Sequence, residues 1–471
     1  MKLTARDIVR FTRGKLVSGS ADSVVEAVSI DTRTIERGDL FVAIRGPHRD
    51  GQDYLANALE RAAAGIVVSQ PIEIVGSAFQ IQVENTTRAL QDLALGVRER
   101  ARLRVVAITG SMGKTTTKEA AALAMGRHLR VLKTEGNLNN LYGLPLTILE
   151  LRDEDVAVLE MGMSEPGEIA RLAEIAKPDV GVLTNVAEVH LEFFDSISQI
   201  ADAKGELLLG LAGDAVAVVN ADDPLVLEQA RKFAGRQIRF GLTPSSDLRA
   251  RQIRSTSAGL RFRAEEGERS VEVTSSLHGR HNVYNLLAGL AAARALDVPL
   301  EEAASGLASL SPARHRGERI SLPGDILLID ETYNSNPRAL ICALDALVVD
   351  EEDDEEDEDE DIGRRVAVVG DMLELGDKAS ELHREVGRHA ATLDLGLLVG
   401  VGPLGREIVD GAREAGMAEA RLATCVDAAE AGALLERSLV EGDVVLVKGS
   451  RGVGLDETIE LAKRSLSEGE S

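Results

Sequence analysis

The stretch of sequence that decides the fold of this chain is Gly110-Ser111-Met112-Gly113-Lys114-Thr115-Thr116. It follows a short apolar run, Val105–Ile108, and precedes a segment of helical pattern that begins at Lys118. A glycine-rich turn at such a junction lets backbone N–H groups approach phosphate, and the N-terminus of the next helix favours negative charge. The lysine of such a loop reaches the β- and γ-phosphates, and the threonine after it is positioned to hold Mg²⁺. The stretch therefore predicts a phosphate-binding loop. It is a shorter variant of the general pattern, whose first glycine would fall at Ile108.

Strands and helices alternate on the C-terminal side of this loop. The strands Val156–Leu159 and Val180–Leu183 each end in a polar residue, which is Glu160 after the first and Thr184 after the second. In a parallel sheet such strand ends lie at one edge, where ligands bind. We therefore predict a mainly parallel, P-loop ATPase-like sheet with its site along that edge, and a β appendage over residues 236–277.

The length of 471 residues suggests about three domains. Residues 1–84 contain short apolar runs separated by turns, which predicts a small α/β module. Residues 85–314 hold the central sheet. Residues 315–471 repeat the alternation and predict a doubly wound, Rossmann-like domain. Its predicted strands lie at 326–329, 366–369, 397–401 and 444–447. The expected fold class is α/β with three domains.

The charge of the chain is unevenly distributed. The formal net charge is −25, but Asp350–Asp361 is an unbroken run of 12 acidic residues. Removing those 12 charges leaves −13 for the rest of the chain, a balance that argues against a nucleic-acid partner. Like charges at that density repel one another, so we assign the run to a disordered surface loop. An interaction tail is the alternative.

Composition also bears on the compartment. The sequence has no run of about 18 apolar residues, which argues against membrane insertion. Charged residues interrupt the first 16 positions and leave no apolar stretch for a signal peptide. The two cysteines, Cys342 and Cys425, form neither a disulfide framework nor a metal spacing, which fits a reducing compartment. We expect a cytoplasmic protein that acts as a monomer.

Further polar motifs follow the phosphate loop. In chain order they are Thr134–Pro145 with Asn137, Asn139 and Asn140, then Glu160-Met161-Gly162, Thr184-Asn185 with His190, Ala203-Lys204-Gly205-Glu206-Leu207, and His281-Asn282-Val283-Tyr284-Asn285. One such motif alone would be a weak signal. In this order they resemble the Mur ligase family and its folylpolyglutamate synthetase relatives, and the resemblance covers essentially the whole chain.

The last third is similar to one branch of that family, which joins D-alanyl-D-alanine to UDP-N-acetylmuramoyl-tripeptide. The similarity is carried by Asp330-Glu331-Thr332-Tyr333-Asn334-Ser335-Asn336-Pro337, Gly370-Asp371-Met372-Leu373-Glu374-Leu375-Gly376 and Lys448-Gly449-Ser450-Arg451-Gly452. Near the start, Asp31-Thr32-Arg33 resembles the segment that holds the UDP-sugar. Four positions depart from the family pattern. Thr32 and Thr332 stand where serine is common, Glu331 where aspartate is, and His315 where glycine is.

The resemblance implies an ATP-dependent ligase that forms a C–N bond in peptidoglycan precursor synthesis. ATP would phosphorylate the terminal carboxylate of the tripeptide, and the free amine of D-alanyl-D-alanine would then attack the acyl phosphate. The three domains would bind the UDP-substrate, ATP and the amine, with the cleft between the second and the third. Closure of those two domains would be needed to bring the amine to the acyl phosphate. The diamino acid at the third peptide position stays open.

The same resemblance implies roles for single residues. Thr115 and Glu160 would hold one Mg²⁺, and His190 with a carbamylated Lys204 would serve a second. A plain lysine, with a pKa of about 10.4, would be cationic and a poor metal ligand, whereas its carbamate offers anionic oxygen, which suits Mg²⁺. The implied catalytic residues are Lys114, Glu160, His190 and Lys204. Beyond the phosphate loop, the implied nucleotide contacts are Asn282, Asn285, Arg316 and Asp330. The implied substrate contacts are Asp31, Thr32, Arg33, Asn137, Asn139, Asn140, Tyr333, Asn334 and Asn336.

Each of these residues taken alone also has an ordinary structural explanation. Lys204 could be a solvated helix lysine, His190 a loop histidine and Glu160 a charge at a strand end.

Three whole-chain alternatives stay open. A Mur ligase that adds a single amino acid would differ in the segment Gly370–Gly376. In a non-ligase P-loop ATPase, Lys204 and His190 would have no role. A catalytically inactive binding protein is disfavoured because every expected catalytic position is filled.

Overall fold

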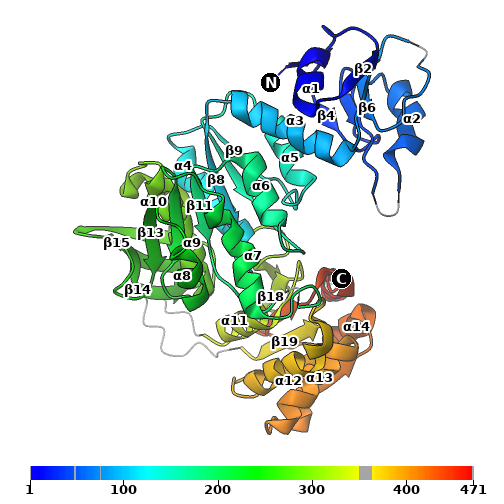
Figure 1. Cartoon of the computed structure of the whole chain (residues 1–471). Coiled ribbons are helices and arrows are strands. Elements are labelled where there is room, and N and C mark those ends of the chain that lie inside the picture. Colours follow the sequence, from blue (N-terminus) through cyan, green and yellow to red (C-terminus); the bar gives the residue numbers. More distant parts are fainter. Residues whose placement is uncertain (1, 47–48, 75, 190, 350–362, 469–471) are drawn as a thin grey trace.

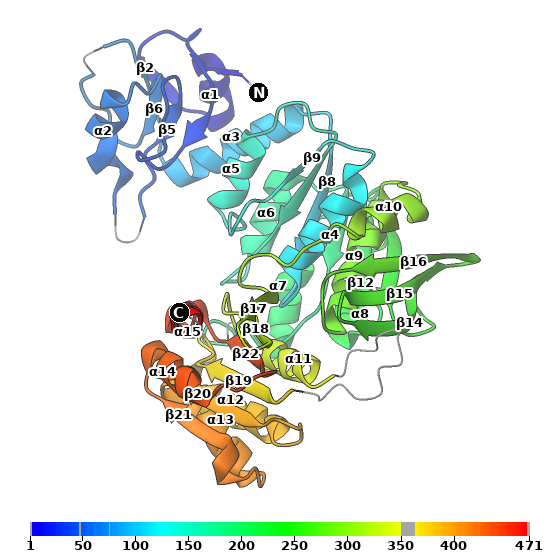
Figure 2. The ribbon, with the colours of Figure 1, turned by 180° about the vertical axis from the view of Figure 1, so that it is seen from behind.

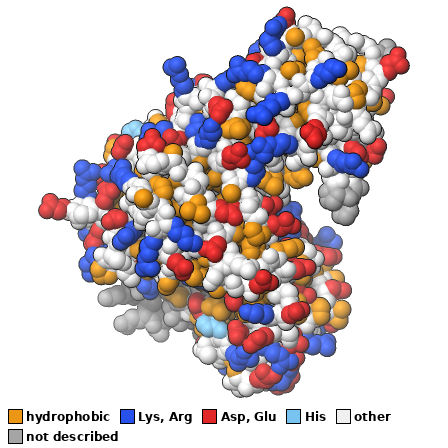
Figure 3. Space-filling view, in the orientation of Figure 1, with side chains coloured by type: hydrophobic (Ala, Val, Ile, Leu, Met, Phe, Trp, Pro, Cys, Tyr) orange, Lys and Arg blue, Asp and Glu red, His pale blue; other side chains and the backbone are white. Residues whose placement is uncertain are grey.

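The computed structural model describes residues 2–46, 49–74, 76–189, 191–349 and 363–468. Figure 1 shows three α/β bodies that follow one another along the chain, with the N-terminal body at one end and the C-terminal body at the other. His190 and the acidic run Asp350–Asp361 lie outside the described residues. Within the described ranges, no helix is both long enough and apolar enough to cross a membrane. Lys and Arg side chains lie interspersed with Asp and Glu over the face drawn in Figure 3.

The N-terminal body is built on a sheet with the order β2-β7-β6-β5-β4, beside a short antiparallel pair, β1 and β3. β2 pairs antiparallel with β7, and the other neighbours run parallel. The first helix starts with a capping box. The Thr4 hydroxyl accepts from the Asp7 N–H at 3.2 Å, and the Asp7 carboxylate accepts from the Thr4 N–H at 3.0 Å. The elements are β1 Leu3–Thr4, α1 Ala5–Thr12, β2 Lys15–Ser18, β3 Val24–Val25, β4 Val28–Ser29, β5 Leu40–Val42, α2 Leu55–Glu60, β6 Gly65–Val68 and β7 Phe79–Gln82.

The central body carries a sheet with the order β16-β15-β14-β13-β12-β11-β8-β10-β9. From β9 to β14 all neighbours are parallel, and β15 and β16 close the edge as antiparallel strands. The strands are β8 Arg104–Thr109, β9 Val131–Lys133, β10 Val156–Glu160, β11 Val180–Leu183, β12 Val216–Asn220, β13 Arg236–Gly241, β14 Leu248–Thr256, β15 Gly259–Glu266 and β16 Arg269–Ser275. The predicted mainly parallel sheet is therefore confirmed.

The predicted β appendage over residues 236–277 consists of β13, β14, β15 and β16, which extend the central sheet at one edge. β13 and β14 continue the central sheet in parallel, and β15 and β16 extend it as a hairpin. The reason lies in the apolar side chains of these strands. Phe240, Leu248 and Phe262 are buried in the same hydrophobic core as the central strands and helix α9. A sheet that shares its core with the neighbouring strands cannot form a free-standing module.

Helices cover both faces of the central sheet (Figure 2). Side chains alternate along β8, so Val106 and Ile108 pack with α4, α9 and α10, while Val105 and Ala107 pack with α3 and the helices of the other face. Helix α3 begins after its N-cap Asn85, whose side chain accepts from the Arg88 N–H at 2.9 Å. The helices are α3 Thr86–Arg100, α4 Lys114–Gly126, α5 Gly143–Leu149, α6 Glu168–Ala176, α7 Ile197–Leu209, α8 Pro224–Ala230, α9 His281–Ala295 and α10 Leu300–Leu307.

The C-terminal body has a doubly wound sheet with the order β17-β18-β22-β19-β20-β21. β17 pairs antiparallel with β18, and all other neighbours are parallel. The four predicted strands are β18, β19, β20 and β22; the two edge strands β17 and β21 were not predicted. The elements are β17 Glu318–Leu322, β18 Ile326–Glu331, α11 Pro337–Leu347, β19 Arg365–Gly370, α12 Ala379–Ala390, β20 Leu397–Val401, α13 Gly402–Glu414, β21 Leu422–Cys425, α14 Ala428–Ser438, β22 Val444–Lys448 and α15 Asp456–Glu468.

Candidate active site

The glycine loop lies at the carboxyl end of β8, and α4 begins at Lys114, four residues before the predicted start. Gly110 and Gly113 have φ angles of +153° and +76°. A Cβ atom on Gly110 would lie 1.9 Å from the Thr184 hydroxyl oxygen, and one on Gly113 would lie 2.0 Å from Asn285 Oδ1. Only glycine fits at either position, and this allows the tight turn that aims backbone N–H groups at an anion.

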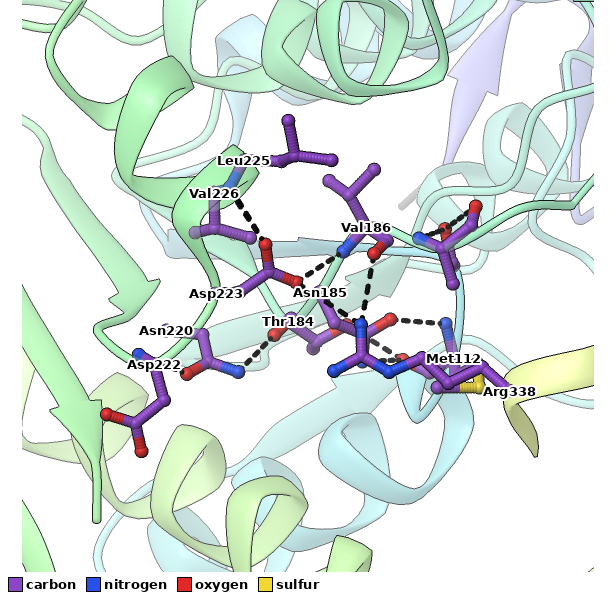
Figure 4. Close-up of polar contacts among 12 residues, drawn as sticks. Met112, Thr184, Asn185, Val186, Asn220, Asp222, Asp223, Leu225, Val226 and Arg338 are labelled. Atoms are coloured by element: carbon purple, nitrogen blue, oxygen red, sulfur yellow. Dashed lines mark hydrogen bonds and ion pairs between the residues drawn. The ribbon is translucent and has the colours of Figure 1, made fainter. Parts of the chain in front are cut away.

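The loop after β11 holds the glycine loop in shape (Figure 4). Asn185 Oδ1 accepts from the Met112 N–H at 2.9 Å, and Asn185 Nδ2 donates to the Met112 carbonyl at 3.1 Å. The Thr184 hydroxyl donates to the same carbonyl at 2.8 Å. The Ser111 N–H donates to the Asn185 carbonyl at 3.0 Å. The end of β11, far from the glycine loop in sequence, therefore fixes the backbone of that loop.

A buried carboxylate lies beside the first turn of α4. Glu160 is 2% exposed at the end of β10; its Oε2 accepts from the Thr115 hydroxyl at 2.8 Å and its Oε1 from Asn139 Nδ2 at 2.8 Å. In the described part of the chain, no three His, Cys, Asp or Glu side chains gather as a metal site. Mg²⁺ in nucleotide sites is commonly bound by one or two protein oxygens together with phosphate oxygens. The carboxylate and hydroxyl of Glu160 and Thr115 fit that kind of site.

Two lysines affect one another's environment at this site, Lys114 and Lys204. Lys204, on α7, is 2% exposed, so it is not a solvated helix lysine. Burial lowers the pKa of Lys204 well below its usual value, and the charge of Lys114 lowers it further. Burial also lowers the pKa of Lys114, an effect that Glu160 opposes and Arg316 reinforces. A lowered pKa increases the neutral fraction of the Lys204 amine, which is the form that can react with CO₂.

The start of α9 lies against the glycine loop. Asn285, which would contact any side chain at Gly113, donates through Nδ2 to Asn282 Oδ1 at 2.8 Å. Asn282 Nδ2 donates to the His278 carbonyl at 2.7 Å. The structure thus brings both predicted nucleotide contacts next to the phosphate loop, and these bonds orient their amides. Their contact with nucleotide stays a prediction.

A second polar group lies at the carboxyl end of β18. Asp330 is 3% exposed; its Oδ1 accepts from the Thr332 hydroxyl at 2.7 Å and its Oδ2 lies 2.7 Å from His315 Nδ1. The Arg316 guanidinium lies 3.8 Å from the centroid of the Tyr333 ring, a distance typical of a cation–π contact. The charge of Arg316 also lowers the pKa of Lys114.

Three of the predicted substrate contacts have structural roles in this arrangement. Asn336 caps α11 by accepting from the Ala339 N–H at 2.9 Å. Asn140 accepts two N–H groups of the turn before α5, at 3.0 and 2.9 Å. Asn334 accepts the N–H of the next residue at 2.8 Å. Asparagine is common at caps and turns because its side chain accepts such backbone N–H groups. Asn137, another predicted substrate contact, is exposed.

The loop Gly370–Gly376 is held by its own domain. Asp371 Oδ1 accepts from the N–H groups of Leu404 and Gly405, at 2.9 and 2.8 Å, near the start of α13. His383 Nε2 accepts from the Met372 N–H at 2.8 Å. Burial lowers the pKa of His383, which favours the neutral ring that this bond requires.

The triplet Asp31-Thr32-Arg33 forms a turn in the N-terminal body, between β4 and β5. The Arg33 guanidinium lies 2.6 Å from the Asp31 carboxylate and lowers its pKa. Arg61 donates to the carbonyl of Arg33 at 2.6 Å. The triplet lies in the N-terminal body, whereas the phosphate-loop cluster lies in the central body (Figure 1). The structure therefore does not bring the two together.

Sequence reasoning missed two residues at this site. Asp223, 4% exposed, follows β12 and accepts from the Val186 N–H at 2.9 Å. It comes three residues after the end of a strand, so the rule that identified Glu160 would also have identified this segment. Arg338, in the first turn of α11, donates to the Val186 carbonyl at 3.1 Å (Figure 4). No pattern in the sequence pointed to Arg338.

Family models match most of the chain. The Mur ligase middle domain matches residues 108–293, and the Mur ligase glutamate ligase domain matches residues 315–451. The model described as Mur ligase family, catalytic domain, matches residues 24–104.

Individual relatives are similar over nearly their whole length. The UDP-N-acetylmuramoyl-tripeptide–D-alanyl-D-alanine ligase of Synechocystis sp. is 35% identical over 465 residues, which cover 97% of each chain. A crystal structure of MurF from Acinetobacter baumannii superposes with a TM-score of 0.88 at 30% identity and covers 98% of each chain. The MurF ligase of Thermotoga maritima in complex with ADP has a TM-score of 0.83 at 29% identity, covering 94% of this chain and 98% of that one.

Proposed function

The chain belongs to the Mur ligase family, and we propose that it joins D-alanyl-D-alanine to UDP-N-acetylmuramoyl-tripeptide with conversion of ATP to ADP and phosphate. The observation that carries this function is similarity to ligases of that specificity over 97% of the chain. The buried pairing of Glu160 with Thr115 beside the glycine loop supports it independently. In this protein the reaction would contribute a peptidoglycan precursor.

We assign one substrate to each part of the chain. Residues 1–84 bind the UDP-substrate, and residues 85–314 bind ATP. Residues 315–471, a range that includes the acidic run 350–361, bind D-alanyl-D-alanine. We propose that the protein acts as a cytoplasmic monomer. Sedimentation of the purified protein at assay concentration tests the monomer, and a dimer mass would refute it.

The first step is transfer of the γ-phosphoryl group of ATP to the terminal carboxylate of the tripeptide. The chemical difficulty is that two anions must approach each other, so the site has to supply positive charge and oriented N–H donors. The backbone of the glycine loop supplies donors, and Lys114 supplies charge at the β- and γ-phosphates. Lys114 lies folded over the loop, 2.9 Å from the Gly110 carbonyl, and would exchange that contact for phosphate oxygen.

Thr115 and Glu160 would hold one Mg²⁺, and Lys204 as a carbamate, with His190, would serve a second. These ions supply charge neutralisation for the transferring phosphoryl group. The contribution of the chain is to make the carbamate possible. The neutral Lys204 amine attacks CO₂, a C–N bond forms, and one proton leaves, which gives an anionic carboxylate on a buried side chain. The lowered pKa of Lys204 favours this, because only the neutral amine has the lone pair.

The second step is attack of the dipeptide amine on the acyl carbon. The amine forms the new C–N bond, the C–O bond to phosphate breaks, and the amine loses a proton. Tyr333, Asn334 and the loop Gly370–Gly376 follow strands β18 and β19, at the edge where a doubly wound sheet binds ligands. We propose that this edge binds the dipeptide.

Phosphate release from ATP in the presence of UDP-N-acetylmuramoyl-tripeptide tests the function. We expect kcat/KM for D-alanyl-D-alanine to exceed that for D-alanine, L-lysine or meso-diaminopimelate by about 10² or more. A site built for a peptide amide and a distal carboxylate leaves about two polar groups unmet by a single residue, at about 1–3 kcal/mol each. Preference for a single amino acid would refute the dipeptide assignment.

A further inference from the structure

The loop after β11 contacts both the glycine loop and the C-terminal body. We call its described residues 184–189 and 191–192 the β11 loop. On one side, its residues Thr184 and Asn185 bond to the backbone of Met112. On the other side, three polar contacts between described residues come from the C-terminal body. They are Arg338 to the Val186 carbonyl at 3.1 Å, Lys378 to the Glu188 carboxylate at 4.0 Å, and the Glu192 N–H to the Glu374 carbonyl at 3.2 Å.

Of these contacts, the one made by Arg338 has partners that are themselves fixed by further hydrogen bonds. Both backbone groups of Val186 are bonded, because its N–H donates to Asp223 Oδ2 at 2.9 Å and its carbonyl accepts from Arg338 (Figure 4). Asp223 Oδ2 also lies 3.6 Å from Arg338 Nη1. Asp223 Oδ1 accepts two N–H groups at the start of α8, at 3.0 and 3.2 Å. The cation therefore approaches a carboxylate that is 4% exposed and fixed by three backbone bonds.

The position of Arg338 in the chain links this contact to the amine site. Arg338 comes two residues after Asn336, so it is continuous with the segment Tyr333–Asn336. The segment Gly370–Gly376 reaches the same β11 loop through Glu374. Both segments assigned to the dipeptide therefore contact the β11 loop. The same β11 loop fixes the phosphate loop through Asn185, the residue before Val186.

We propose that Arg338 is a positioning residue for amide formation, which holds the dipeptide segment at a fixed place relative to the phosphate loop. This inference rests on the proposed function. Arg338 does not shape the phosphate loop itself, because Asn185 and Thr184 do so from within the central body. Loss of Arg338 therefore leaves nucleotide binding intact and lowers the rate at which bound dipeptide meets the acyl phosphate.

The experiment compares wild-type protein with Arg338→Met, Arg338→Lys and the control Arg388→Met. Arg388 is an arginine of α12 whose partner, Glu414 at 4.0 Å, is in the same body. We expect Arg338→Met to lower kcat/KM for D-alanyl-D-alanine about tenfold, the order for one charge-assisted hydrogen bond with a 51% exposed donor. The ADP-induced shift of the thermal midpoint stays at the wild-type value. Arg338→Lys recovers part of the loss, and Arg388→Met stays within about twofold.

Two outcomes overturn the inference. One is a kcat/KM for the dipeptide in Arg338→Met within about twofold of wild type. The other is a loss of the ADP-induced shift of the thermal midpoint in Arg338→Met alongside the loss of kcat/KM. That result would make Arg338 a general structural residue. A scattering measurement needs no activity: the radius of gyration of Arg338→Met should exceed those of wild type and Arg388→Met, and equal radii refute the contact. Wild-type protein that ignores D-alanyl-D-alanine would refute the proposed function separately.

Discussion

Removal of the Lys204 amine is the sharpest test of the chemistry. Lys204→Ala deletes a side chain that is 2% exposed and whose pKa is lowered by burial and by Lys114. An ordinary lysine with a pKa of about 10.4 is neutral in only about 0.4% of molecules at pH 8. The lowered pKa of Lys204 raises that fraction, and we therefore expect Lys204 to form a carbamate more readily than an ordinary lysine. On the proposed mechanism, we expect the variant to lose this anionic group and with it one ligand of the metal site.

The expected fall in kcat of Lys204→Ala follows from the role proposed for Lys204 as a metal ligand. Changes to groups that only orient a metal ligand cost about 10–100-fold in activity. Loss of a ligand itself should cost more, so we expect kcat to fall by at least about 10², which corresponds to about 2.7 kcal/mol of transition-state stabilisation. The loss should appear mainly in kcat, because the charge that needs stabilising develops during phosphoryl transfer. Formate or acetate should restore part of the rate by filling the space with a carboxylate.

A second buried lysine provides the control. Lys118, on α4, is 1% exposed and donates to the Thr134 carbonyl at 2.6 Å. Lys118→Ala removes an equally buried amine from the same body, so any general effect of the cavity appears in both variants. Small carboxylates should not rescue Lys118→Ala. Turnover of Lys204→Ala within about tenfold of wild type, or equal rescue of both variants, would refute the carbamate.

The remaining predictions concern charge. Glu160→Gln keeps the shape of the side chain and an acceptor for Thr115 but removes the negative charge, so phosphate release should slow by about 10² or more, with a thermal midpoint near wild type. Asp7 has its pKa lowered by Arg100, so it stabilises the fold above its unfolded-state pKa and loses that effect as pH falls below about 4. Urea unfolding of Asp7→Asn should show a loss of about 1 kcal/mol at pH 7 that shrinks by pH 3; an equal loss at both would contradict the linkage. Replacing residues 350–361 with a short Gly/Ser linker should leave kcat within about tenfold, since salt screens exposed charges over about 8 Å.

The phosphate site could be predicted because its chemistry follows from strand ends. Gly110, Thr184 and Glu160 come directly after apolar strands, and parallel strands bring their carboxyl ends to one edge. Asp330, which the family resemblance implied, lies at the corresponding edge of the C-terminal sheet. Hydrophobic alternation predicted the strands themselves. It missed β17 and β21, which are edge strands with only partly buried side chains and therefore a weaker apolar signal.

Contacts between bodies could not be predicted in this way. Arg338 is half exposed, lies in the first turn of a helix and has no periodic partner in the sequence. Its role depends on the position of the Val186 carbonyl, which belongs to a different body. Asn336 and Asn140 make local bonds that their sequence motif did not indicate. Asparagine is a preferred cap, and the local backbone uses both side chains in this way. Their substrate contacts stay predictions.

The departure at His315 shows how a sequence can replace a family residue without losing the local structure. Glycine is common at this position in the family, and the backbone of His315 has a φ of +62°, a conformation that costs a non-glycine residue about 1–2 kcal/mol. The ring offsets this cost, because Nδ1 lies 2.7 Å from the Asp330 carboxylate, and a hydrogen bond to a charged group contributes about 1.5–3 kcal/mol. The same bond holds the Asp330 carboxylate. The substitution therefore exchanges the conformational freedom of glycine for a side-chain contact that orders the carboxyl end of β18.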